Sequence, residues 1–74
     1  MREGEFRLFF FSREKSRRHI HVSHPDGEAK FWLEPKIELA RNIGLGSAKI
    51  TEAERLIKTR QKEITNAWIN HFGS

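Results

Sequence analysis

The stretch RRHIHVSHPDGEAKFWLEP, residues 17–35, decides how the rest of the chain is interpreted. Apolar and polar side chains alternate strictly over residues 18–23, and a second run that is typical of a strand covers residues 28–33. Between them, His24-Pro25-Asp26-Gly27 favours a turn, because proline restricts φ and Asp-Gly supplies the left-handed backbone positions of a tight hairpin. The stretch therefore predicts a β-hairpin.

The two strands of this hairpin can be sorted into faces, because successive side chains on a strand point to opposite sides of a sheet. One face would carry the apolar side chains Ile20, Val22, Ala29, Phe31 and Leu33. The opposite face would carry His19, His21, Lys30 and Trp32. We expect the apolar face to be covered and the histidine-bearing face to stay accessible.

Segments on either side of the hairpin add strands and a helix. Residues 6–11 are dominated by bulky aromatics and predict a strand that adds Arg7, Phe9 and Phe11 to the accessible face. Residues 37–42 alternate like a strand but contain good helix formers, and we favour a strand. From about residue 47 to 72, apolar residues recur at three- and four-residue spacing, which predicts one amphipathic helix.

Together these elements predict an α+β fold. A small antiparallel sheet of three or four strands, within residues 6–42, would be packed on one face by the long C-terminal helix. Such a helix would be about 39 Å long, whereas a six-residue strand spans only about 20 Å. The helix must therefore overhang the sheet, bend at the polar residues 60–62, or pack on another chain, which makes a homodimer a candidate assembly.

Length and composition limit the class of protein. The chain of 74 residues is one domain, residues 1–74, near the lower limit for independent folding. It contains no cysteine, which excludes a disulfide framework and a thiolate metal site and favours the cytoplasm. No apolar run is long enough to span a membrane, and the net charge of +4 favours acidic partners such as nucleic acid.

Several short motifs resemble those of a known family. They are His19-Ile20-His21-Val22, Ala29-Lys30-Phe31-Trp32-Leu33, and the later stretches ELARNIGL and AWINHFG. From residue 9 to 73 the chain resembles the domain-of-unknown-function 4160 family of small bacterial proteins, although Arg17-Arg18 stands where many members have two prolines. The resemblance implies a bacterial cytoplasmic setting and a small protein partner encoded nearby, in a toxin–antitoxin-like arrangement. It implies no reaction.

The leading hypothesis is a binding module, one half of such a two-protein system. Aromatic side chains on an open sheet face stack on bases, and interleaved lysine and arginine hold phosphates. The module would contact RNA or its partner protein through the histidine-bearing face. The candidate binding residues are Arg7, Phe9, Phe11, Arg17, Arg18, Lys30 and Trp32.

Two alternatives use the histidines chemically. His19 and His21 could act as the acid and base of a metal-independent ribonuclease, with nearby cations holding the developing charge. A His-x-His metal site is the other alternative, with His24 as a third ligand, but no cysteine or carboxylate cluster completes a zinc set. We expect no metal and no cofactor, and whether the protein is an enzyme stays open.

Overall fold

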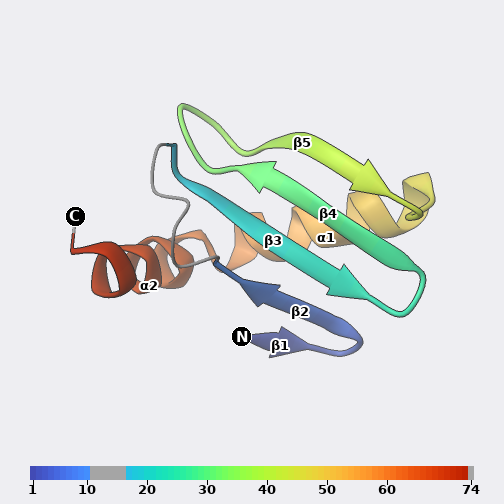
Figure 1. The fold of residues 1–74 in the computed structure, drawn as a ribbon, viewed down its shortest axis with the longest axis horizontal. Helices are drawn as coiled ribbons and strands as arrows, with labels where there is room; N and C mark the ends of the chain where they lie inside the picture. The colour runs from blue at the N-terminus through green and yellow to red at the C-terminus, as the bar shows by residue number, and fades with distance from the viewer. Residues whose placement is uncertain (11–16, 74) are drawn as a thin grey trace.

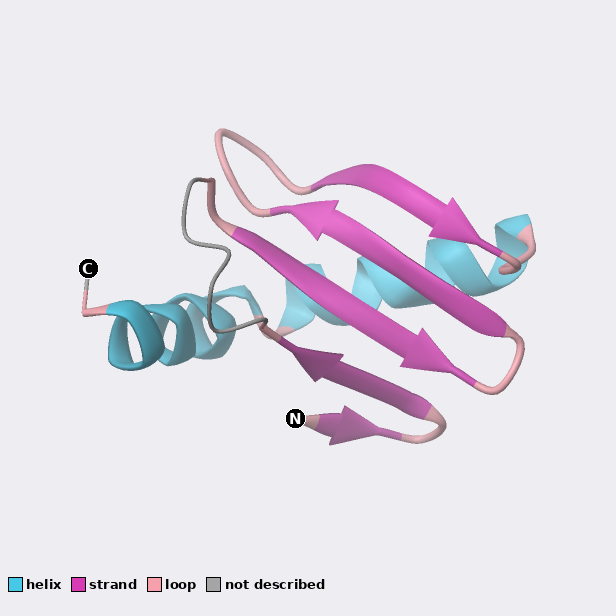
Figure 2. Ribbon diagram, in the orientation of Figure 1, coloured by secondary structure: helices cyan, strands magenta, loops and turns pink. Residues whose placement is uncertain are grey.

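The computed structural model describes residues 1–10 and 17–73 (Figure 1). Within these residues, five strands form one antiparallel sheet in chain order. The strands are β1 (Arg2–Glu3), β2 (Phe6–Phe9), β3 (His19–His24), β4 (Gly27–Trp32) and β5 (Glu38–Ile43). The helices α1 (Ser47–Thr59) and α2 (Gln61–Phe72) follow. Helix α1 lies behind the sheet, and α2 extends past the left end of the sheet in this view (Figure 2).

The α+β class and the antiparallel sheet agree with the prediction from sequence, and residues 38–43 are indeed a strand. The predicted number of three or four strands is wrong. The additional strand, β1, pairs Arg2 with Arg7 and Glu3 with Phe6. Two residues are too few to show an alternating pattern, so the sequence carried no periodic signal for this strand. No helix in the described part of the chain is long and apolar enough to cross a membrane.

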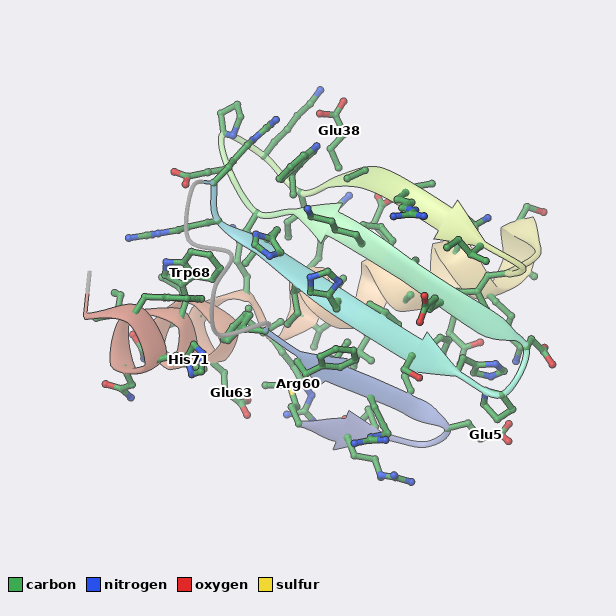
Figure 3. All side chains as sticks on the ribbon, viewed as in Figure 1. Glu5, Glu38, Arg60, Glu63, Trp68 and His71 are labelled. Atoms are coloured by element: carbon green, nitrogen blue, oxygen red, sulfur yellow. The ribbon has the colours of Figure 1, made fainter. Side chains whose placement is uncertain are left out.

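The prediction of one continuous helix is also wrong, because the helix breaks at Arg60 (Figure 3). This is the polar position at which a bend was one of the expected alternatives. The Arg60 guanidinium donates hydrogen bonds to the carboxylate of Glu3 on β1 and to that of Glu63 on α2, the latter at 3.1 Å. The hydrogen bond and the charge of Glu3 raise the pKa of Arg60 above its ordinary value. The break in the helix is therefore tied to the first strand.

The hydrophobic core lies between the sheet and the two helices. The sheet contributes six buried side chains: Phe6, Leu8, Ile20, Val22, Ala29 and Phe31. Helices α1 and α2 and the loop before them contribute the others: Leu45, Ala53, Ile57, Ile64 and Trp68. The predicted apolar face is confirmed by this burial, although Leu33 at its end is only half-buried.

The β3–β4 turn consists of Pro25 and Asp26, and its backbone differs from the prediction. Within the described residues, positive φ angles occur only at Gly4, Gly44 and Gly73, so Asp-Gly supplies no left-handed position. Glycine is required at position 27 for a different reason. A Cβ atom on Gly27 would lie 2.1 Å from the carbonyl oxygen of Ile43, so only glycine lets β4 begin this close to the end of β5.

Candidate functional site

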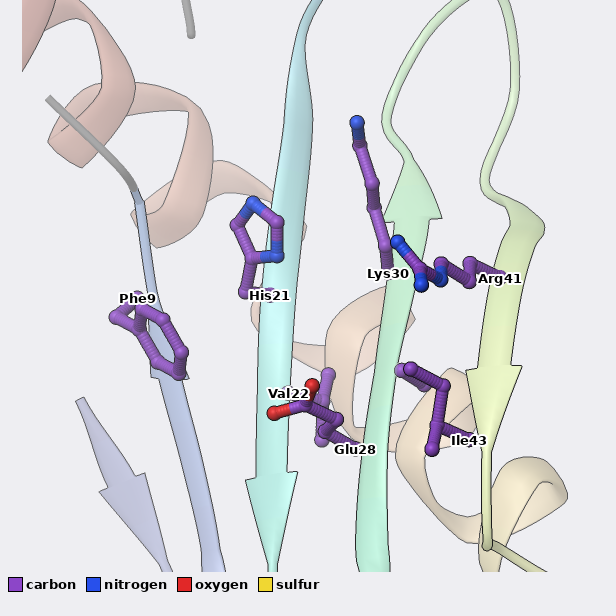
Figure 4. A pocket seen from close by; sticks show the side chains of 8 residues that line it. Phe9, His21, Val22, Glu28, Lys30, Arg41 and Ile43 are labelled. Carbon is purple, nitrogen blue, oxygen red and sulfur yellow. The ribbon is translucent and has the colours of Figure 1, made fainter. Parts of the chain in front are cut away.

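The sheet face opposite the helices, which we call the open face, carries one row of side chains across four strands. Strand register places Phe9 opposite His21, His21 opposite Lys30, and Lys30 opposite Arg41. Directly opposite residues project from the same face, so these four side chains lie next to one another (Figure 4). We call them the Phe9–Arg41 row. Together with Glu28 and Ile43 they line a shallow hollow of about 160 Å³.

The two halves of the Phe9–Arg41 row differ in chemistry. The rings of Phe9 and His21 are stacked, with centroids 5.5 Å apart and planes inclined by 21°. On the neighbouring strands, the positive side chains of Lys30 and Arg41 stand at one register position. Like charges placed directly opposite one another in a sheet are unfavourable. The row thus joins a flat aromatic surface to a concentrated positive charge.

Trp32 forms a second aromatic surface near the start of β3. The guanidinium carbon of Arg17 lies 4.2 Å from the centroid of the Trp32 ring, and the Lys30 Nζ lies 4.8 Å from it. Both distances are within the range of cation–π attraction. The Arg17 Nε also donates a hydrogen bond to the carbonyl oxygen of Glu34, at 3.0 Å, which holds the guanidinium at the ring.

The strands place more positive than negative side chains on the open face. Arg7 lies opposite Arg2 on the β1–β2 pair, so both project on the same side as Phe9. The strand residues with charge on this face are Arg2, Arg7, Lys30 and Arg41, against Glu28 and Glu38. Arg2 and Arg41 were not predicted as site residues. Only the strand register, which needs the fold, shows that they belong there.

His19 does not behave as predicted. Its side chain was expected to be accessible, but the residue is only 1% exposed. The Nδ1–H donates a hydrogen bond to the carbonyl oxygen of Arg17, at 2.6 Å, since a carbonyl can only accept. Trp68, which α2 carries past the end of the sheet, meets the ring edge-on with 5.3 Å between centroids (Figure 3). The expectation of an exposed His19 is therefore wrong, and the path of α2 is the reason.

The two proposed catalytic histidines are adjacent but differ in access to solvent. The rings of His19 and His21 are perpendicular, with centroids 5.0 Å apart, and only His21 is partly exposed. His24 lies on the opposite face, where its Nδ1 accepts a hydrogen bond from the N–H of Asp26. Among the residues described, no three histidine, cysteine, aspartate or glutamate side chains gather closely enough to hold a metal ion.

The structure brings together most of the predicted binding residues. Phe9, Lys30 and Trp32 share the open face with Arg7, and Arg17 covers the Trp32 ring. Arg18 is half-buried, and its backbone N–H donates to the Glu34 carboxylate at 3.0 Å. The prediction for Phe11 lies outside the described residues.

Comparison with known proteins identifies a family and nothing more detailed. A family model described as a domain of unknown function, DUF4160, matches residues 5–69. No curated protein gives a significant match to the chain, and no solved structure does so either. The open face must therefore be interpreted from its own geometry.

Proposed function

The chain belongs to the DUF4160 family, and we propose that it is a binding module for single-stranded RNA. The observation that carries this proposal is the Phe9–Arg41 row, which places stacked rings beside paired cations on an open sheet. The family resemblance adds the proposal of a bacterial, cytoplasmic protein that works with a small partner protein encoded nearby.

The aromatic side chains would provide the stacking surfaces. The Phe9–His21 pair and Trp32 are all partly exposed, and they lie on three different strands. Proteins that bind single strands stack successive bases on such rings, and each stacked base contributes about 1–3 kcal/mol. Because Arg17 lies over the Trp32 ring, we expect this guanidinium to move aside or to stack on the incoming base itself.

The cations would hold the phosphates that connect those bases. Lys30 and Arg41 flank the Phe9–His21 pair on one side, and Arg7 precedes Phe9 by two residues on the same face. An RNA strand that runs across the β-strands could place its phosphates next to these cations and stack its bases on the aromatic rings. Sequence-tolerant single-strand binding uses this arrangement.

The shape of the site supports a surface interaction more than an enclosed reaction. The hollow of about 160 Å³ is smaller than the pockets of about 300–1,000 Å³ that enclose small-molecule ligands. Its floor is the sheet itself, and its walls are long side chains (Figure 4). Such a hollow accommodates part of a polymer that continues across the face.

The ribonuclease alternative has less support. Acid–base cleavage needs two groups within hydrogen-bonding reach of one substrate, whereas the His19 ring is buried behind Trp68. The test is to incubate the protein with labelled RNA in the presence of a chelator and follow the length of the RNA. Cleavage that His21→Ala and His19→Ala each abolish would restore this alternative.

Binding is tested by fluorescence anisotropy with a labelled single-stranded RNA of about 12 nucleotides, within the range that one such surface covers. Trp32→Ala should weaken binding by about 1–3 kcal/mol through lost stacking. Lys30→Ala should weaken binding to all sequences alike and lower the salt slope by about 1. Lys62→Ala removes the same charge from an exposed position on α2 and should leave affinity nearly unchanged.

Two results would contradict the proposal. One is an affinity for RNA that does not change between about 50 and 200 mM salt, because phosphate contacts release counterions. The other is equal binding by the Trp32, Lys30 and Lys62 variants. Failure to bind RNA combined with Trp32-dependent capture of the partner protein would reassign the open face to protein docking.

A further inference from the structure

Strand β5 is the long free edge of the sheet. Among the residues that the structure describes it pairs only with β4, and all six of its residues are exposed. The other edge of the described sheet, β1, is only two residues long. Along an edge strand, every second residue points its N–H and C=O away from the sheet, which makes the strand a template for pairing with another strand.

The edge strand β5 exposes apolar as well as charged side chains. Leu39 and Ile43 are 39% and 45% exposed, and they are two of the four large apolar side chains most exposed in the described chain. Unpaired edge strands are commonly protected by charged side chains, proline or bulges rather than by exposed apolar side chains. Strand β5 combines two charged residues, Glu38 and Arg41, with the exposed apolar side chains of Leu39 and Ile43.

The register of β5 places its two charges on one face. Glu38 lies opposite Trp32 and Arg41 opposite Lys30, two residues apart on β4. A bulge in β5 lies between these pairs, so Glu38 and Arg41 both project on the open face although they are three residues apart in sequence. Leu39 lies opposite Phe31 and projects on the other face. Glu38 is visible at the outer margin of the sheet in Figure 3.

We propose that two copies of this chain pair through β5, antiparallel, about a two-fold axis at Leu39. Such a contact is isologous: if residue i of one copy contacts residue j of the other, then residue j of the first copy contacts residue i of the other. Because the bulge leaves Arg41 one strand position from Leu39, as Glu38 is on the other side, Leu39 would meet Leu39 of the second copy and Glu38 of each copy would lie beside Arg41 of the other. Within the described residues neither Glu38 nor Arg41 has an ion pair in the single chain, so both charges are available.

The charges also select this register over its neighbours. An axis at Glu38 would place the two Glu38 carboxylates opposite each other, and an axis at Arg41 would oppose the two guanidinium groups. Like charges directly opposite in a sheet are destabilising, whereas opposite charges stabilise. Of these registers, only the one centred on Leu39 pairs opposite charges and also covers an exposed apolar side chain. The resulting continuous sheet would join the open faces of the two copies.

The proposal does not depend on RNA binding, and its test contains no RNA. The mass of the protein is measured over a wide range of concentration by analytical ultracentrifugation. Contacts made by one strand are at the small end of protein interfaces, so we expect a concentration-dependent rise from 8.7 kDa toward twice that mass. A wild-type protein that stays at 8.7 kDa at all concentrations overturns the proposal.

Charge reversal identifies the interface. Glu38→Arg places an arginine beside Arg41 of the second copy, and Arg41→Glu places a glutamate beside Glu38, so each variant alone should be monomeric. Mixed in equal amounts, the two variants should form a heterodimer with two ion pairs. One is the native pair between Arg41 of the Glu38→Arg variant and Glu38 of the Arg41→Glu variant, and the other joins the two substituted positions with reversed polarity. Control variants with the same charge changes on the helices, Glu52→Arg and Lys62→Glu, should dimerise like the wild type.

Both β5 positions are exposed, so far-ultraviolet circular dichroism should show that the variants fold. Dimers of the single variants as strong as those of the wild type, or a mixture that stays monomeric, would overturn the pairing. Concentration-dependent protection of β5 amides from hydrogen exchange would support it, because strand pairing protects outward N–H groups and side-chain contact alone does not.

Discussion

The two faces of the sheet are built by the same strands, yet they have different properties. Phe31 and Trp32 are consecutive on β4, but Phe31 is fully buried beneath the helices and Trp32 is partly exposed beside Arg17 and Lys30. The helix-covered face holds the hydrophobic core, and the open face holds the charged and aromatic side chains. The comparison teaches that single-residue alternation along a strand separates the core side chains from the surface that we propose binds RNA.

Phe31→Ala should produce the largest effect, because it removes a fully buried ring from the core. Large-to-small changes of this kind cost about 3–5 kcal/mol, which approaches the whole stability of a domain of this size. Lys30→Ala, the neighbour on the open face, should change stability by less than about 0.5 kcal/mol. Chemical denaturation followed by circular dichroism measures both, and equal losses would show that the two faces do not divide these roles.

The histidine pair tests the same division within one face. His19→Ala removes a buried ring that contacts Trp68 and a hydrogen bond to the Arg17 carbonyl, so we expect a loss of about 1–3 kcal/mol of stability. His21→Ala should cost less stability but should weaken RNA binding, because the His21 ring stacks on Phe9 in the Phe9–Arg41 row. The reverse result, a stable His19 variant that has lost binding, would place His19 in the functional surface.

Arg60→Ala should affect stability less than Phe31→Ala or His19→Ala. It removes the hydrogen bonds to Glu3 and Glu63 at a partly exposed position, so the thermal midpoint should fall slightly and the difference should shrink as salt is added. The matched control is Lys58→Ala, which removes an ordinary pair with Glu54 along one helix. If the link to β1 holds α2 in place, only Arg60→Ala should alter the near-ultraviolet signal of Trp68.

The pH dependence of the Arg60 contribution follows from its raised pKa. A cation whose pKa is higher in the folded protein than in the unfolded chain stabilises fully below the unfolded value, and loses that contribution only as pH rises through the folded value. The ordinary pKa of an arginine already lies well above pH 9, and the folded pKa of Arg60 is higher still. The difference in thermal midpoint between wild type and Arg60→Ala should therefore not change between neutral pH and pH 9 through titration of Arg60. If this difference in thermal midpoint decreased over that range, a group other than Arg60 would have to account for the pH dependence.

Much of the open face could be predicted because strand alternation is a local property. The runs around Ile20 and Phe31 assigned the neighbouring Lys30 and Trp32 to the opposite face, and the structure agrees. Arg41 could not be assigned in this way, because the bulge in β5 changes which of its residues share a face. Gly27 was correctly placed near a turn, but its role in the close approach to Ile43 depends on a strand distant in sequence.

By itself, the sequence determined the α+β class, the buried side of the central hairpin, and a helical segment with a weak point near residue 60. These features follow from hydrophobic periodicity and turn-forming residues, which act over a few positions of the chain. Only the tertiary structure decided that α2 carries Trp68 over His19, that Arg60 is tied to Glu3, and that Arg41 completes the row with Phe9. Each of these contacts joins segments that are far apart in sequence, and their geometry depends on how the helices pack and how the strands register.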